Sequence, residues 1–294
     1  MTIRSILHQY QRAVIEMNQK NALVGFTVDH YRGMPISMII AMLKFFGVEF
    51  VEIARSVFDD LENVAAKMKE VRSAFHLPFV HLDGWDLSCY DYSAQIDEVI
   101  EQINLNKDRL HIHHAIAHPP EPYMASAPLN SSLDLLFENL KRIDLPVYIE
   151  NVHGTSPDEF ENLCSQAQDA LGVQFAGMCF DGPHFLVNGF DPIAQFHRFR
   201  RDVGCIHLSD CAADDDSHLP FEAGGVFPVK EFLKTLNSGF SGYITLEIKP
   251  RSFHEIEKYI QSYLLIQKRM SKKKWLRTWL RWHLFLPVIK RFIT

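Results

Sequence analysis

The sequence predicts a parallel α/β barrel of eight strand–helix units, a (β/α)8 TIM barrel, followed by a basic amphipathic helical extension. Short apolar runs alternate eight times with longer amphipathic stretches between residues 22 and 268, as repeated strand–helix units do. Six successive runs end in His, Asp or Glu, the pattern expected at the functional face of such a barrel. A doubly wound open sheet is the alternative, but the chain has no GxGxxG turn.

The predicted strands are the short apolar runs, each too short for a typical helix. They cover residues 22–28, 49–54, 77–82, 110–117, 146–151, 174–180, 205–209 and 243–248.

The predicted helices are the amphipathic stretches that follow the strands. In the first of them Ile36, Ile39, Ile40 and Leu43 recur at helical spacing. In the second, acidic residues lead and basic residues trail, the order that the helix dipole favours. The helices cover residues 35–46, 61–75, 92–105, 131–143, 157–171, 192–203, 229–236 and 253–268, after an N-terminal helical segment. The barrel domain is therefore predicted to comprise residues 1–270, and the extension residues 271–294.

Charge is distributed unevenly along the 294 residues, whose formal net charge is −6. Residues 271–294 contain seven Lys and Arg and no acid, so residues 1–270 carry a net charge of −13. Because neutralisation of phosphates dominates non-specific affinity for nucleic acids, an acidic barrel is a poor match for a duplex. Nucleic acid is not expected as a partner.

Nothing in residues 1–17 resembles a signal peptide, because charged residues interrupt the apolar ones. The apolar run 38–47 is too short to span a bilayer. The five cysteines are scattered and form no CxxC pair, which predicts reduced thiols in a cytoplasmic protein.

The strand ends predict a metal site. Taken alone, Asp181 would be a helix cap and His184 an ordinary loop histidine. However, carboxylates that converge on one face, such as Glu150, Asp181 and Glu247, repel one another unless a cation neutralises them. The imidazoles and carboxylates at or after the strand ends are His81, His111, His113, His114, His118, Glu150, Asp181, His184, His207, Asp210, Asp214, Asp215, Asp216, His218 and Glu247. Mixed imidazole and carboxylate donors suit zinc, manganese, iron or cobalt better than calcium.

These motifs resemble the xylose-isomerase-like barrel superfamily, which contains sugar and sugar-phosphate isomerases and epimerases together with endonuclease IV. The resemblance covers nearly the whole chain to Met270 and is sharpest over residues 147–247. It is carried by Ile149-Glu150-Asn151, Cys179-Phe-Asp181 with His184, His207-Leu-Ser-Asp210, Asp216-Ser-His218-Leu-Pro with Gly224, and Leu246-Glu247.

In the isomerase and epimerase branch, the resemblance implies one divalent ion (Mn, Zn, Co or Fe) held by Glu150, Asp181, His207 and Glu247. The ion polarises the substrate carbonyl, and the two glutamates act as the catalytic base and acid that move the α-proton through an enediolate. The leading hypothesis is therefore a metal-dependent isomerase or epimerase of a small sugar or sugar phosphate.

In the endonuclease IV branch, a three-zinc cluster hydrolyses the phosphodiester at an abasic site. The resemblance then implies additional ligands, namely His81, His118, His184, Asp216 and His218. The alternative hypothesis is thus a zinc phosphoesterase with two or three ions. The acidic barrel, the scarcity of Arg and Lys between the motifs, and the short spacing from His207 to Asp216 speak against it.

Substrate contacts are harder to predict. Trp85 and Lys249 adjoin motif positions and are candidates for binding the sugar, Trp85 through its ring face. The alternatives are that Trp85 packs in the barrel and that Lys249 pairs with a loop acid. Asn151 is a candidate for orienting Glu150 through a hydrogen bond.

The extension places Trp275, Trp279 and Trp282 on one helical face, flanked by Lys and Arg. This pattern is typical of a helix that docks on a membrane surface or a partner. The alternative is a final helix packed against the barrel with solvated charges. Pro287 is predicted to end or kink the helix. A third functional hypothesis follows, a non-enzymatic barrel tethered to a membrane; the sequence predicts no oligomeric state.

Overall fold

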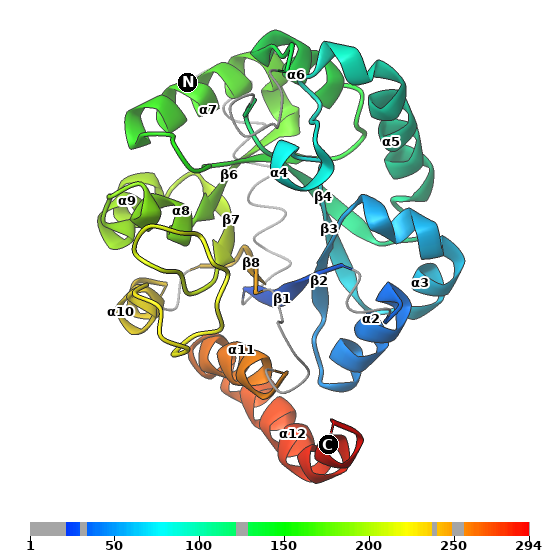
Figure 1. The fold of residues 1–294 in the computed structure, drawn as a ribbon, viewed down its shortest axis with the longest axis vertical. Coiled ribbons are helices and arrows are strands. Elements are labelled where there is room, and N and C mark those ends of the chain that lie inside the picture. Colours follow the sequence, from blue (N-terminus) through cyan, green and yellow to red (C-terminus); the bar gives the residue numbers. More distant parts are fainter. Residues whose placement is uncertain (1–21, 30–33, 122–128, 237–239, 249–255, 294) are drawn as a thin grey trace.

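The computed structural model describes residues 22–29, 34–121, 129–236, 240–248 and 256–293. Their strands form a closed barrel in which every strand pairs in parallel with its neighbours in sequence and β8 closes on β1 (Figure 1). The strands are β1 (Leu23–Val28), β2 (Phe50–Ile53), β3 (Arg72–His76), β4 (Ile112–Ala117), β5 (Val147–Glu150), β6 (Phe175–Asp181), β7 (Val203–Leu208) and β8 (Tyr243–Leu246). The predicted TIM barrel is confirmed.

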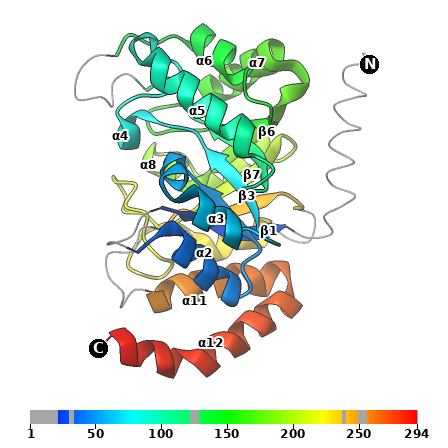
Figure 2. The same cartoon turned by 90° about the vertical axis from the view of Figure 1, so that its right-hand side faces the viewer.

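Helices surround the barrel on the outside (Figures 1 and 2). The best-defined start belongs to α7, where Ser156 and Glu159 form a capping box and Pro157 occupies the first turn. The described helices are α2 (Ile36–Phe45), α3 (Leu61–Lys67), α4 (Val80–Asp83), α5 (Ser93–Asn106), α6 (Leu133–Leu140), α7 (Pro157–Leu171), α8 (Gly182–Val187), α9 (Pro192–Phe199), α10 (Val229–Thr235), α11 (Ile256–Met270) and α12 (Lys272–Ile293). The predicted N-terminal helical segment lies outside the described residues.

The third unit differs from the prediction of a helix over 61–75 and a strand over 77–82. Helix α3 ends at Lys67, β3 begins at Arg72, and residues of the expected strand form α4 instead. Pro78 explains the latter change, because a proline cannot donate to the ladder of an inner strand. Glu70 adopts a left-handed conformation with φ 70°, so the helix has ended before it. The third strand consequently ends at His76 and not at His81.

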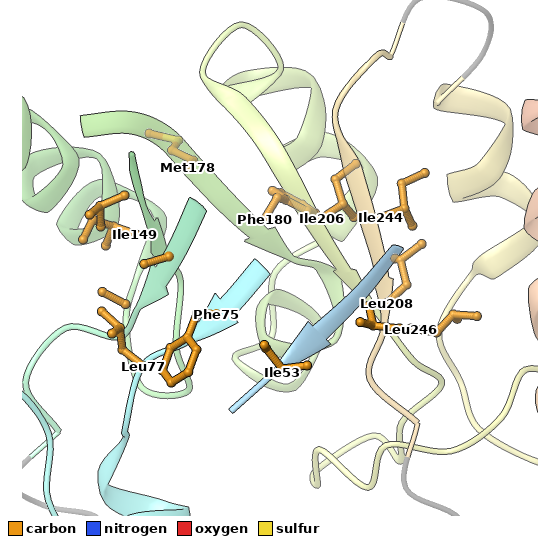
Figure 3. Packing of buried hydrophobic residues seen from close by; sticks show 14 of the residues in the cluster. Ile53, Phe75, Leu77, Ile149, Met178, Phe180, Ile206, Leu208, Ile244 and Leu246 are labelled. Atoms are coloured by element: carbon orange, nitrogen blue, oxygen red, sulfur yellow. The ribbon is translucent and has the colours of Figure 1, made fainter. Parts of the chain in front are cut away.

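The larger hydrophobic core lies between the barrel wall and the helices. Ile53, Phe75, Ile149, Phe180 and Ile206 are all fully buried there, and Figure 3 shows such side chains along the strands. Successive side chains of a strand point to opposite faces, so the residues between these positions point into the barrel.

Two layers of side chains fill the barrel interior. The lower layer, nearer the start of the strands, is a buried cluster of Leu23, Phe50, Ala74, Ile116, Tyr148, Cys179, Cys205 and Tyr243. The upper layer consists of residues two positions further along seven of the strands, which is the spacing that returns to the same face. Its members are Glu52, His76, His118, Glu150, Asp181, His207 and Thr245.

Helix α12 lies outermost, beside α11 (Figures 1 and 2). Trp282 is buried against Phe46, with ring centroids 5.4 Å apart, and the Thr278 hydroxyl donates to the Phe46 carbonyl at 2.9 Å. Of the two outcomes predicted for Pro287, an end of the helix is wrong, because the helix continues through it to Ile293; a kink stays a prediction. None of the described helices combines the length and apolar character that crossing a membrane requires.

Candidate metal centre

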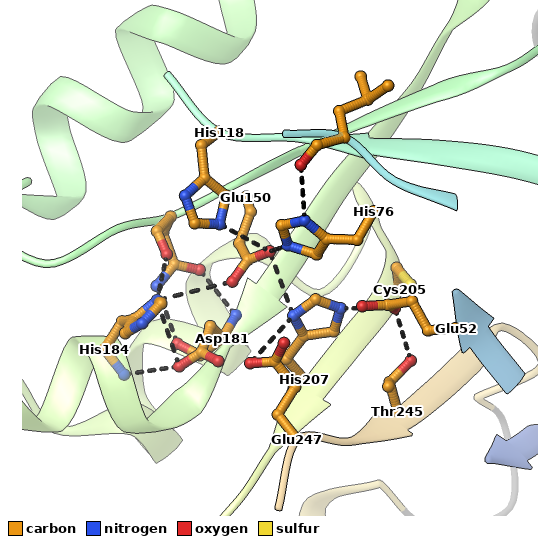
Figure 4. A network of polar contacts seen from close by, with 12 residues as sticks. Glu52, His76, His118, Glu150, Asp181, His184, Cys205, His207, Thr245 and Glu247 are labelled. Carbon is orange, nitrogen blue, oxygen red and sulfur yellow. Dashed lines mark hydrogen bonds and ion pairs between the residues drawn. The ribbon is translucent and has the colours of Figure 1, made fainter. Parts of the chain in front are cut away.

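The upper layer of the barrel brings together the residues predicted as metal ligands (Figure 4). Glu150, Asp181, His207 and Glu247 each offer a donor atom, and these atoms all lie within 4.8 Å of one another. The four side chains come from the ends of β5, β6, β7 and β8. In TIM barrels the connecting loops that carry chemistry gather at this end of the strands. We call these four residues the central group.

Glu150 occupies the middle of the site, where it is 1% exposed. Its Oε2 lies 3.1 Å from His207 Nδ1, 3.4 Å from His118 Nε2 and 3.5 Å from His76 Nε2. Its Oε1 lies 3.6 Å from His184 Nδ1. Removing a carboxylate from water costs several kcal/mol, so a buried Glu150 requires positive charge beside it.

Four histidines of the site each have one ring nitrogen hydrogen-bonded to an oxygen. The pairs are His76 Nδ1 with the Leu77 carbonyl (2.9 Å), His118 Nδ1 with the Glu121 carboxylate (2.7 Å), His184 Nδ1 with the Asn151 carbonyl (2.7 Å) and His207 Nε2 with the Glu52 carboxylate (3.0 Å). Carbonyl and carboxylate oxygens accept, so these nitrogens carry the proton, and in a neutral ring the other nitrogen presents a lone pair. Such oxygen partners fix the tautomer and orientation of histidines that bind metals.

The residues present fit a divalent cation. Glu150 Oε2 and His207 Nδ1 are both buried, and neither has a hydrogen-bond partner within the described part of the chain. With the Nε2 proton of His207 donated to Glu52, a lone pair of each atom faces the other across 3.1 Å. Two such atoms repel unless a proton or a cation lies between them. The mixture of imidazole and carboxylate donors suits zinc, manganese, iron or cobalt.

A second group of donors adjoins the central group. His76, His118 and Glu150 also offer atoms within 4.8 Å of one another. Glu150 belongs to both groups, so it would be among the residues that hold a cation in either one.

A third group lies around the loop that follows β7. Asp216 Oδ2 is 3.2 Å from His184 Nε2 and 3.0 Å from His218 Nε2. His218 Nδ1 is 4.0 Å from Glu247 Oε2, which connects this loop to the central group. The structure therefore brings together eight of the nine ligands that the resemblance implies.

Histidines and carboxylates neutralise one another where no cation is bound. Burial disfavours the charged form of His118, but Glu150 and Glu121 outweigh burial and raise its pKa to about 10. Burial likewise disfavours the charged form of Glu150, but His207 and His118 outweigh it and hold its pKa well below the usual range. The site is thus a network of imidazolium and carboxylate groups whose protons a metal ion would displace.

Asp181 serves two purposes at the end of β6. One carboxylate oxygen accepts from the backbone N–H of His184 at 2.6 Å and so caps α8. Its backbone is bonded in both directions to the Asn151 side chain, at 2.8 Å each. Burial raises the pKa of Asp181 well above its usual range, and the neighbouring Asp216 adds to this against the opposing effect of His184. Asn151 therefore positions Asp181 and His184, whereas the sequence suggested that it orients Glu150.

Three other predicted site residues lie elsewhere. His81 is exposed on α4. The position in the site that was expected for His81 is occupied by His76. Trp85 is 6% exposed and stacks on Tyr92, with ring centroids 5.9 Å apart, which is the packing alternative; its contact with a substrate stays a prediction. Lys249 lies outside the described residues.

Sequence reasoning missed two residues of the site, Glu52 and His76, and a hydroxyl that supports them. Glu52 is fully buried, and its Oε2 accepts from both His207 Nε2 and the Thr245 hydroxyl at 3.0 Å. The signal for Glu52 was present, since it is the one charged residue in the strand Phe50–Ile53. His76 was missed because β3 was predicted as the end of a helix.

The sequence matches the model of a family described as xylose isomerase-like TIM barrel over residues 41–269. No curated protein matches the chain. Similar solved structures include D-allulose 3-epimerase from Methylomonas sp. in complex with D-allulose, which is 13% identical with a TM-score of 0.58, over 82% of this chain and 90% of that one. A xylose isomerase domain protein from Planctomyces limnophilus is 16% identical with a TM-score of 0.57, over 86% and 98%.

A third similar structure is the AP endonuclease, family 2 from Brucella melitensis, which is 12% identical with a TM-score of 0.54, over 79% of this chain and 94% of that one. At these identities the similarity shows the shared fold. Relatives named as sugar epimerases and as an endonuclease therefore share this barrel.

Proposed function

Because the chain belongs to the xylose isomerase-like TIM barrel family, we propose that it is a metal-dependent isomerase or epimerase of a small sugar or sugar phosphate. One observation carries the proposal: Glu150 Oε2 and Glu247 Oε2 both flank His207 Nδ1, at 3.1 and 3.6 Å. The two carboxylates come from β5 and β8, so they reach a common point from different directions. A base on one side of a substrate carbon and an acid on another is what transfer of an α-proton needs.

Each residue of the site has a separate role in the proposed reaction. A bound divalent ion, held by the central group, supplies the Lewis acidity that makes the proton next to a carbonyl acidic. One of Glu150 and Glu247 removes that proton, and the other returns a proton to the neighbouring atom or to the opposite face. His184 stands at the edge of the central group, held by the Asn151 carbonyl through Nδ1, and its Nε2 would have to exchange Asp216 for a sugar hydroxyl in order to bind the substrate.

The substrate class rests on charge and on the named relatives. Residues 1–270 have a net charge of −13, which favours a neutral polyol over a long polyanion. The epimerase similar to this chain was solved in complex with D-allulose. We place the protein in the cytoplasm, in keeping with five cysteines that are all free thiols.

Exchange of the α-proton with solvent tests the proposal. The metal-loaded protein is incubated in D₂O with a panel of ketoses, aldoses and their phosphates, and nuclear magnetic resonance follows deuterium incorporation and new isomers. We expect exchange that Glu247→Gln reduces by about 10²–10⁴-fold, whereas Glu138→Gln, which removes an exposed carboxylate on α6, leaves it unchanged. A fully loaded sample that exchanges no proton in any substrate contradicts the proposal.

A second candidate, a multinuclear zinc phosphoesterase, is favoured by the two groups that adjoin the central one. His76 and His118 in one group, and His184, Asp216 and His218 in another, supply donors for further ions. Two or three zinc ions per chain by elemental analysis, with cleavage of an oligonucleotide at an abasic site, would establish this function. One ion per chain and no cleavage would exclude it.

A further inference from the structure

Helix α12 has one face that is firmly attached to the barrel domain. In addition to the contacts of Thr278 and Trp282 with Phe46, Arg281 Nη1 donates to the Phe45 carbonyl at 2.6 Å. Lys274 Nζ lies 2.7 Å from the Glu49 carboxylate. The inner face of the helix is therefore occupied by the connection between α2 and β2.

The outer face of α12 exposes apolar side chains in a row. Leu276 and Leu280 are each 47% exposed and Leu284 is 70% exposed, and the three recur at a spacing of four residues. Trp279, on the same side of the helix, is 37% exposed and stacks on His283 with ring centroids 4.2 Å apart. A contiguous apolar stripe on a protein surface indicates an interaction site rather than random exposure.

Unpaired positive charges flank this stripe. Lys272, Lys273 and Arg277 are exposed, and within the described part of the chain no salt bridge involves any of them. Residues 271–294 contain no acid that would offset them. The outer face thus combines leucines and a tryptophan with cationic side chains that are free to bind anions.

We propose that the outer face of α12, defined as Lys272, Lys273, Leu276, Arg277, Trp279, Leu280 and Leu284, binds the surface of an anionic membrane. Helices with this composition lie in the plane of the interface, with the apolar face among the acyl chains and the basic residues at the phosphates. Charge complementarity selects this occupant: the stripe is apolar enough to enter lipid, and its rim is purely cationic. A second copy of the chain would have to bring its own α12 against this one, which would set the two cationic rims against each other, since residues 271–294 contain no acid.

The position of α12 is compatible with catalysis at such a surface. Besides packing on α11, it contacts Phe45, Phe46 and Glu49, which immediately precede β2 and so lie at the start of that strand. The metal centre lies at the opposite end of the barrel, where the strands finish. A membrane-bound α12 therefore does not need to cover the substrate entrance.

Sedimentation with vesicles tests the proposal on the full-length protein. Vesicles of phosphatidylcholine alone are compared with vesicles that also contain phosphatidylglycerol, at low and at high salt. We expect binding to the anionic vesicles only, weakened by salt, with a shift of tryptophan fluorescence to shorter wavelength. Since each basic residue near the surface contributes on the order of a fivefold change in affinity, the triple variant Lys272→Gln/Lys273→Gln/Arg277→Gln should bind roughly a hundredfold more weakly.

A matched control removes the same charge elsewhere. Lys67→Gln/Lys141→Gln/Arg200→Gln changes three exposed basic residues far from α12 in sequence and should bind like the unmodified protein. A separate variant, Leu276→Ser/Leu280→Ser/Leu284→Ser, tests the apolar stripe and should also lose binding while it retains the circular dichroism of the native fold.

Three results would overturn the proposal. The first is failure of the protein to sediment with anionic vesicles. The second is equal binding by the α12 variants and the control. The third is a dimer, seen by light scattering, that dissociates in the leucine variant while vesicle binding is absent, which would show that a second copy covers the face. None of these readouts depends on enzymatic turnover, so they are independent of the function proposed for the metal centre.

Discussion

The two layers inside the barrel are built on the same strands and differ in almost every property. Phe50, Tyr148 and Cys205 of the lower layer stand two residues before Glu52, Glu150 and His207 of the upper layer. The lower layer packs aromatic rings, with Phe50 and Tyr243 centroids 5.0 Å apart. The upper layer brings carboxylates and imidazoles together, and their mutual repulsion is removed only by bound protons or a cation.

The difference shows how one scaffold separates stability from chemistry. The lower layer stabilises the closed barrel through burial of apolar surface, which does not require a bound cation. The upper layer holds donor atoms in place with strands that the lower layer fixes, so the site is organised before a ligand arrives. Changes in the lower layer should therefore alter stability, and changes in the upper layer should alter metal binding and activity.

Replacing Glu150 should have the largest effect, because it belongs to two groups of donors. In Glu150→Gln we expect metal retention after dialysis to fall to background and α-proton exchange to fall by about 10²–10⁴-fold or more. Elemental analysis and the exchange assay measure these losses, with Glu138→Gln as the control. A variant that keeps its full metal content would place the ion away from Glu150.

Replacing Phe50 tests whether a change in the lower layer alters stability without altering metal binding. Phe50→Ala removes a fully buried ring, and we expect the free energy of unfolding to fall by about 3–5 kcal/mol. Denaturant titration of the metal-free protein measures the loss. Metal stoichiometry below the unfolding transition should be unchanged, and a large loss of metal under those conditions would show that the layers are not independent.

Glu52 tests how the upper layer is supported. Glu52→Gln weakens the acceptor for His207 Nε2 and should lower metal affinity by about 10–100-fold, measured by competition with a chelator. Thr245→Val removes the other hydrogen bond to the Glu52 carboxylate and should have a smaller effect. Equal affinities in Glu52→Gln and the unmodified protein would show that His207 does not depend on this carboxylate.

The charged groups of the upper layer should make the stability of the protein depend on pH, and this is the smallest of the expected effects. The pKa of His118 is raised from 6.5 to about 10, so its contribution is complete below pH 6.5 and is lost as pH rises towards 10. The pKa of Glu150 is lowered from 4.5, so its contribution is present above pH 4.5 and is lost as pH falls further.

These signs predict that the metal-free protein is most stable between about pH 4.5 and 6.5. Urea titrations across the pH range, with a chelator present, measure the trend. Bound metal should remove much of the alkaline loss, because it replaces the protons on the histidines. A metal-free protein whose stability increases from pH 6.5 to 9 would contradict the charged network.

The barrel was predictable because its signal is repeated. Eight alternations of apolar and amphipathic stretches leave few other arrangements, and each predicted strand except the third overlaps the observed one. The third failed because charges at residues 61–75 continue a helical pattern past Lys67, whereas pairing with β2 and β4 converts Arg72–His76 into a strand. Tertiary pairing here overrides local preference.

The residues of the site could be predicted from the sequence only where their strands had been located. The structure brings Glu150, Asp181, His207 and Glu247 together as expected, because they stand at or near the ends of strands that were located correctly. His76 was lost with its strand, and His81 was chosen in its place. Glu52 was overlooked although it stands as near the end of β2 as His207 does to the end of β7, and only the closed barrel shows that it faces His207. Roles that depend on three-dimensional neighbours cannot be obtained from position along the chain alone.

The donors of the centre come from every strand between β2 and β8, so no local segment of the chain contains a binding site. A cation can be bound tightly only after the last strand has docked, which makes its capture a late event in folding. Thereafter any opening between two strands that both supply donors would have to release a bound cation. Its binding free energy would thus be added to each of the seams from β3 to β8, and protease resistance of that part of the barrel would become a function of the free metal concentration.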